Sequence, residues 1–151
     1  MNRIALPATA PWGIALLRVV AGIIFVMHGQ QKLFEFGIGG VSGMMTGLGV
    51  PAPSLMAIVV TLVELVGGIA LILGAFTRIA AVLVAIDMLT AMALMHWPNG
   101  FFASNGGYEL VLALAAIGVT LALTGPGALA LDHRLPVERR LAAPNLAPAP
   151  R

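Results

Sequence analysis

Four long apolar segments, each interrupted by only a few polar residues, follow one another along the chain. They cover residues 12–34, 54–75, 77–97 and 107–124. Each is near the length of roughly 20 residues that a helix needs to cross a bilayer, where every backbone amide must be bonded within its own segment. The pattern predicts an all-α fold, a four-helix transmembrane bundle built as one domain from residues 1–135.

Turn-forming residues support the limits of these segments. Pro51 and Pro53 precede the second, Pro98 follows the third, and glycine and proline alternate from Gly125 after the fourth. The second and third segments are separated only by the stretch around Phe76, so we expect them to form an antiparallel hairpin.

Two stretches lie outside the four segments. Residues 35–50 are rich in glycine and carry Met44, Met45 and Leu48 at helical spacing, so a short interfacial helix and a plain loop both fit. Residues 136–151 are rich in proline and alanine, and we expect a disordered tail there.

The composition agrees with a membrane protein. Hydrophobic residues make up 60% of the chain and charged residues 9%, against roughly 45–50% and 25% in soluble domains. Cysteine is absent, which excludes disulfides, thiolate nucleophiles and CxxC redox pairs. A chain of this kind that handles electrons needs a bound cofactor or a partner to carry them.

The positive charges predict the orientation in the membrane. With four spans, both termini and the second connection share one side, and that side carries six arginines while the opposite side has only Lys32. Because positive residues stay inside, both termini should be cytoplasmic. The arginines indicate contact with the lipid bilayer, and nothing in the sequence indicates nucleic acid.

Every predicted span contains at least one ionisable residue. A charge at the bilayer centre costs at least about 2.5–3.5 kcal/mol on insertion scales, so such residues normally face the bundle interior and find partners. The residues concerned are Arg18, His28, Glu64, Asp87, His96 and Glu109.

Small residues share a helical face with most of these groups. Such faces let helices approach closely, so we expect the four of them to meet at the bundle centre, although they could equally serve a homo-oligomer. The faces are Arg18, Gly22, Phe25, Gly29 and Lys32; Ala57, Thr61, Glu64 and Gly68, with Ala75 loosely aligned; Ala80, Asp87 and Ala91; and Glu109, Ala113, Ala116 and Thr120.

The depth of each ionisable residue along its helix predicts which of them form ion pairs. We expect Arg18 to pair with Glu64 first and with Asp87 second, and the remaining acid to be protonated or hydrogen-bonded. An Arg18–Glu64 pair would serve equally well as a structural ion pair or as a functional group.

A second polar cluster is expected at the non-cytoplasmic ends of the spans. It would contain His28, Lys32, His96 and Glu109, close to Asn99, Asn105 and Tyr108. Asp87 and His96 are nine residues apart, so in a regular helix they point to opposite faces.

Several side chains allow more than one interpretation. His28 and His96 could ligate haem, but hydrogen-bonded histidines are the favoured interpretation. The methionines are best explained as packing residues, and we assign no metal site. Phe101 and Phe102 either anchor the protein at the membrane interface or form the mouth of a pocket for an apolar ring such as a quinone.

Several short motifs together resemble the DoxX family of small four-helix membrane proteins. They are HGQQKLF from His28, ELVGGIALILGAFTR from Glu64, NGFF from Asn99, GGYE from Gly106 and GPGALALD from Gly125. The resemblance points to His28, Gln31, Lys32, Glu64, Asn99, Tyr108 and Glu109 as site residues. Asp87 matches no family motif, and Glu35 stands where glycine is common in the family.

The resemblance implies a role near quinone or redox metabolism in the bacterial inner membrane. We expect an accessory subunit or binding module that works with a redox-enzyme partner rather than a self-sufficient enzyme, and assign no catalytic residue. Two alternatives remain open: a small transporter or proton-conducting protein built around Glu64, Asp87 and Arg18, and a scaffold that recruits cytoplasmic enzymes.

Overall fold

The computed structural model describes residues 8–135, and all regular elements in that range are helical. The four predicted spans are confirmed as helices α1, α3, α4 and α5. The long helices are α1 (Ala10–Gln30), α3 (Pro53–Leu73), α4 (Thr77–Ala91) and α5 (Glu109–Thr124). Residues 136–151, for which we expected disorder, lie outside the described range.

Shorter elements extend and connect these helices. A π-helical turn (Gln31–Phe36) joins α1 to α2 (Gly37–Gly47), which supports the helical interpretation of residues 35–50 over the loop. A second π-helical turn (Met92–His96) and a 3₁₀ turn (Trp97–Asn99) extend α4. Two further 3₁₀ turns, Ala103–Asn105 and Leu131–Arg134, lie before and after α5.

The helices have the length and surface of membrane spans. Ala10–Gly47, Pro53–Leu73 and Thr77–Asn99 are long and apolar enough to cross a bilayer, while α5 is apolar but shorter. Large apolar side chains are exposed along all four, which suits lipid and not water. Trp12 and Trp97 lie exposed near opposite ends of the bundle, as expected of tryptophans at the two membrane surfaces.

Helix α1 packs closely against α3 because glycines remove side chains from the contact. A Cβ atom on Gly68 would lie 2.7 Å from the backbone nitrogen of Val26 and 2.8 Å from the carbonyl oxygen of Gly22. A Cβ atom on Gly29 would lie 2.6 Å from the backbone nitrogen of Leu65. Small residues therefore bring the two backbones together, as predicted for these faces.

Helix α4 packs against α5 in the same manner. A Cβ atom on Gly118 would lie 3.0 Å from the carbonyl oxygen of Ala81 and from the Cβ atom of Ala85. Between the two helix pairs lies an apolar core that includes Phe25, Leu71, Val84 and Leu121.

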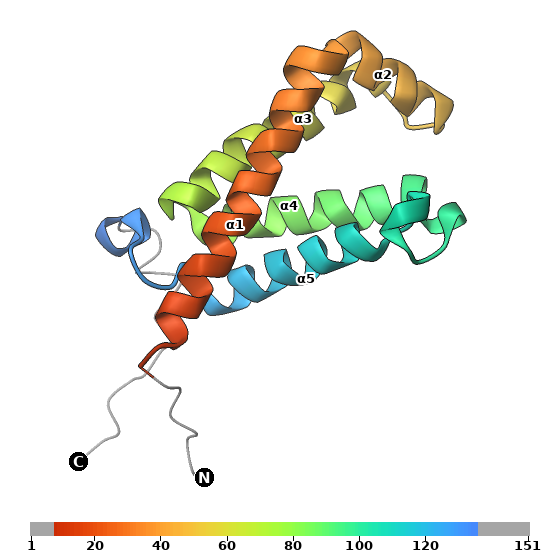
Figure 1. Cartoon of the computed structure of the whole chain (residues 1–151). Coiled ribbons are helices and arrows are strands. Elements are labelled where there is room, and N and C mark those ends of the chain that lie inside the picture. The colour runs from red at the N-terminus through yellow and green to blue at the C-terminus, as the bar shows by residue number, and fades with distance from the viewer. Residues whose placement is uncertain (1–7, 136–151) are drawn as a thin grey trace, which may run out of the picture.

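The two pairs converge at one end of the bundle and diverge at the other (Figure 1). The described chain ends both lie at the convergent end, where the backbone N–H of Ala128 donates to the carbonyl of Pro11 over 2.8 Å. At the divergent end the chain turns at Gly37, whose φ of 65° favours glycine, and α2 packs against α3.

The predicted inward face of α5 is wrong. Ala113, Ala116 and Thr120 are exposed, and the buried face consists of Val111, Leu114, Ala115, Gly118 and Leu121. Because α5 is apolar on every side, its small residues do not reveal which face meets the other helices. Glu109 misled the assignment, since its carboxylate accepts a hydrogen bond from the backbone N–H of Ala103 in the preceding loop instead of entering the bundle.

Candidate functional site

Arg18 does not pair with Glu64 or Asp87, which corrects the expected ion pair. Its side chain is 1% exposed and lies at the convergent end. The guanidinium donates to the carbonyls of Leu71 at 3.0 Å, Ala128 at 3.2 Å and Leu129 at 3.1 Å. The carbonyl of Leu71 also accepts from the backbone N–H of Gly74, so Arg18 joins the capped end of α3 to the segment after α5.

Asp132 completes this arrangement, and sequence reasoning missed it. Its carboxylate accepts hydrogen bonds from the backbone N–H groups of Phe76 and Thr77, so a residue far along the chain caps the start of α4. Its own backbone N–H donates to Gly74 over 2.8 Å. The only sequence signal was its place at the end of the GPGALALD motif. The convergent end is therefore a structural junction.

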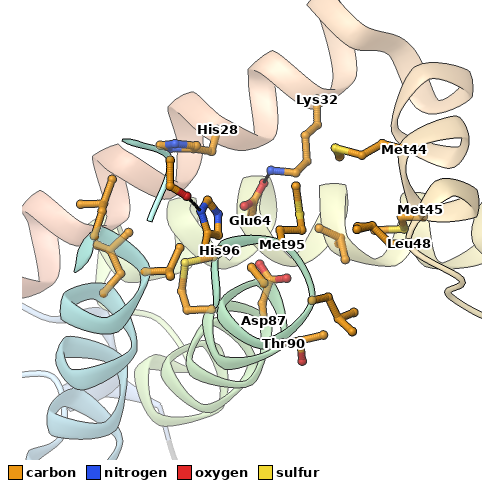
Figure 2. A pocket seen from close by; sticks show the side chains of 18 of the residues that line it. His28, Lys32, Met44, Met45, Leu48, Glu64, Asp87, Thr90, Met95 and His96 are labelled. Atoms are coloured by element: carbon orange, nitrogen blue, oxygen red, sulfur yellow. Dashed lines mark hydrogen bonds and ion pairs between the residues drawn. The ribbon is translucent and has the colours of Figure 1, made fainter. Parts of the chain in front are cut away.

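A cavity of about 350 Å³ opens between the helix pairs at the divergent end. This volume lies within the range of small-molecule sites, roughly 300–1,000 Å³. The walls are mostly apolar. Figure 2 shows Met44 and Met45 of α2, with Leu48 just after that helix, on one side and Met95 near the centre. Methionines expected only to fill gaps thus form flexible walls that adapt to varied apolar shapes.

An ion pair lies inside the cavity. Lys32 of the first π-helical turn places Nζ 2.6 Å from Oε2 of Glu64 on α3. Glu64 is 2% exposed. Asp87 projects from α4 toward this pair (Figure 2), and its Oδ2 atom is buried without a hydrogen bond from any described residue.

Two histidines line the same cavity in a defined hydrogen-bonding state. Nδ1 of His28 lies 2.9 Å from the carbonyl of Ile24, and Nδ1 of His96 lies 2.7 Å from the carbonyl of Gly106. A carbonyl only accepts, so each Nδ1 must carry the hydrogen. A ring that carries its hydrogen on Nδ1 alone keeps Nε2 as a hydrogen-bond acceptor.

The prediction that Asp87 and His96 point to opposite faces of their helix is wrong, because both line the cavity. The helix between them changes to π-helical geometry at Met92–His96. The wider i→i+5 turn rotates His96 back toward the side that Asp87 faces. The first π-helical turn similarly contributes Lys32 and Gln31 to the wall.

Other predicted site residues lie beside the cavity rather than in its wall. Asn99 donates to the carbonyls of Met95 and Gly106, and so holds the loop to which His96 bonds. Tyr108 stacks on Trp97 with 5.0 Å between ring centroids and meets Phe101 edge-on at 5.5 Å. Phe101 and Phe102 are exposed and do not line the cavity, which disfavours the interpretation as a pocket mouth. Interfacial anchoring stays a prediction.

The predicted polar residues thus separate into two groups. His28, Gln31, Lys32, Glu64, Asp87 and His96 line one cavity, whereas Arg18, Asn99, Tyr108 and Glu109 do not. Within residues 8–135, no three His, Asp or Glu side chains gather in a way that could hold a metal ion.

Comparison with known proteins gives relatives along most of the chain. A protein of Haemophilus influenzae is 36% identical over 127 residues, which cover 82% of this chain and 91% of that protein. "Putative oxidoreductase CatD" of Bacillus subtilis is 39% identical, covering 80% and 84%. "Inner membrane protein YphA" of Escherichia coli is 31% identical, covering 84% and 93%. No solved structure matches.

The family model of DoxX matches residues 13–97, which include most of α1, all of α2, α3 and α4, and all six of the polar residues that line the cavity. Relatives from two bacteria, Escherichia coli and Mycobacterium tuberculosis, are membrane proteins by name. The helices, their apolar surfaces and this match lead to one conclusion: the chain is a multi-pass bacterial membrane protein that belongs to the DoxX family.

Proposed function

We propose that this chain is a binding module of the bacterial inner membrane that holds an uncharged ring ligand of the quinone class in the cavity at its divergent end. In this proposal it works as an accessory subunit beside a redox partner. The observation that carries the proposal is a cavity with apolar walls into which a few polar groups project from different helices.

The chemistry of the wall supports a ligand with both apolar and polar parts. Methionine and leucine side chains from α2 suit a ring or an isoprenoid-like chain. With the ring hydrogen on Nδ1 alone, the Nε2 atoms of His28 and His96 suit a hydroxyl donor, such as that of a reduced quinone. A relative that carries an oxidoreductase name supports the redox connection.

Photoaffinity labelling tests the proposal directly. The purified protein in lipid nanodiscs is irradiated with an azido-benzoquinone that has a short alkyl chain, and the labelled peptides are identified by mass spectrometry. We expect labelling of cavity residues that excess unlabelled quinone suppresses.

Two variants on neighbouring positions provide a matched comparison. Ala91 lines the cavity, so Ala91→Phe should fill it and abolish the protected labelling. Ala93 is exposed and outside the wall, so Ala93→Phe should leave labelling intact. Labelling that falls mainly on lipid-facing residues, or that both variants affect equally, would overturn the proposal.

A second function, proton or small-ion transport, is favoured by one observation, the Lys32–Glu64 pair beside Asp87 within the membrane span. Transport also needs a path to the opposite side, and beyond the cavity Leu71 and Leu121 are buried in the core of the bundle. Flux into proteoliposomes that disappears in Glu64→Gln would favour this function over ligand binding.

A further inference from the structure

The carboxyl group of Asp87 lacks the partners that a buried anion needs. It lines the cavity, yet its Oδ2 atom is buried and accepts no hydrogen bond from residues 8–135. An ionised carboxylate offers acceptors only, and leaving them unpaired in a low-dielectric site costs several kcal/mol. The geometry therefore disfavours the charged form of this group.

The charges around Asp87 lead to the same result. Lys32 is the one lysine or arginine in the cavity wall, and it is already bonded to Glu64. Of the other wall elements, α1 and the second π-helical turn present His28 and His96, whose Nδ1 atoms donate to backbone carbonyls and not to Asp87. The wall residues from α2 and α5 carry no titratable side chain. A second negative charge beside Glu64 would have no cation of its own.

A neutral carboxylic acid has one O–H group to donate. Oδ2 is enclosed by protein, so Oδ1 is the oxygen that a molecule in the cavity would meet. We propose that Asp87 is a protonated acid whose O–H donates a hydrogen bond to a carbonyl oxygen of the ligand, and that it selects the oxidised, carbonyl-bearing form and rejects anions. This inference rests on the proposed function, since it names the group that recognises the ligand.

The inference divides recognition between two sides of the cavity. Asp87 meets an acceptor oxygen, whereas the Nε2 atoms of the two histidines meet a donor. The one lysine of the cavity wall is bonded to Glu64, so an anionic ligand would find no unpaired cation there. An oxidised quinone, whose two oxygens both accept, satisfies Asp87, whereas the hydroxyl groups of the reduced form suit the histidines. Asp87 is therefore the group that favours the oxidised form.

Binding of a short-chain benzoquinone to the full chain in nanodiscs tests the inference, measured by calorimetry across a pH series. In the wild type, affinity should fall as rising pH removes the Asp87 proton. Asp87→Asn keeps a neutral donor of the same shape, so its affinity should stay near that of the wild type and lose the pH dependence. Asp87→Leu lacks the donor and should bind about tenfold more weakly. Leu89→Ala, on the lipid-facing side of α4, serves as the control.

Infrared spectroscopy supplies a readout that needs no ligand. The wild type should show the carbonyl band of a protonated carboxylic acid at neutral pH, and Asp87→Asn should lose that band. Binding that is independent of pH, together with no such band, would overturn the inference and leave the proposed function standing. A band that disappears in Asp87→Asn, without binding of any quinone, would support the protonated acid and overturn both the proposed function and the recognition of a ligand by Asp87.

Discussion

At the scale of single residues, charged side chains in this protein serve two separate purposes. Arg18 and Asp132 satisfy backbone groups at helix ends, where unpaired carbonyls and amides would be costly in a membrane. Lys32 and Glu64 pair with each other inside a cavity. The same residue types therefore stabilise the fold at one end and define the candidate site at the other.

Removal of the Asp132 carboxylate should destabilise the fold. Asp132→Ala leaves the N–H groups of Phe76 and Thr77 without their charged acceptor, so we expect the free energy of unfolding to fall by about 1.5–3 kcal/mol. Chemical unfolding in detergent micelles measures this. Glu35→Ala is the control, because Glu35 is exposed and bonds only to the exposed Gln31, and its effect should stay within about 0.5 kcal/mol. Equal effects of the two changes would contradict the capping role.

At the scale of elements, glycines determine which helix faces can pack closely. The π-helical turns determine which side chains of α1 and α4 face the cavity. The α1–α3 contact is backbone to backbone at Gly22, Gly29 and Gly68. The two π-helical turns both end at the cavity, and such turns often mark functional sites. The two helix pairs converge at one end and diverge at the other, where the π-helical turns lie, and this divergence leaves room for the cavity.

An added methyl group at the α1–α3 contact should force the helices apart. The new Cβ atom of Gly68→Ala would meet backbone atoms of Val26 and Gly22 that cannot rotate away, so we expect a loss of about 1–3 kcal/mol in unfolding free energy. Gly13→Ala on α1 has open space and should be neutral or stabilising by up to about 1 kcal/mol. If Gly68→Ala unfolds like the wild type in the same assay, the contact is looser than described.

At the scale of the whole molecule, the two ends of the bundle have different roles. The segment after α5 joins the helices at the convergent end, and the divergent end holds the cavity beneath α2 and the loop before α5. The arginine distribution predicts that the convergent end faces the cytoplasm, so the cavity would lie toward the opposite membrane surface.

Single-cysteine labelling tests this orientation, and the cysteine-free chain gives no background. Ser104→Cys, in the exposed loop before α5, should react with a membrane-impermeant maleimide in intact cells. Ala8→Cys, exposed at the convergent end, should react only after permeabilisation. The reverse pattern would invert the predicted topology without affecting the fold.

Much of the architecture follows from the sequence alone. Hydropathy and turn residues locate the four long helices, because lipid requires each span to satisfy its own backbone. Glycine positions on α1 and α3 predict their close contact for the same local reason. The inward direction of Arg18 and Glu64 also follows, since both are too costly to expose to lipid.

Only the tertiary structure decided which of these polar groups meet. Arg18 turned to carbonyls of α3 and of the segment after α5, Glu64 turned to Lys32, and Asp132 capped a helix more than fifty residues earlier in the chain. The π-helical turn at Met92–His96 brought His96 to the side of Asp87 against regular helical spacing. Partners depend on depth, rotation and helix divergence, which are set by packing between distant segments, whereas a span depends only on its own residues and the solvent around it.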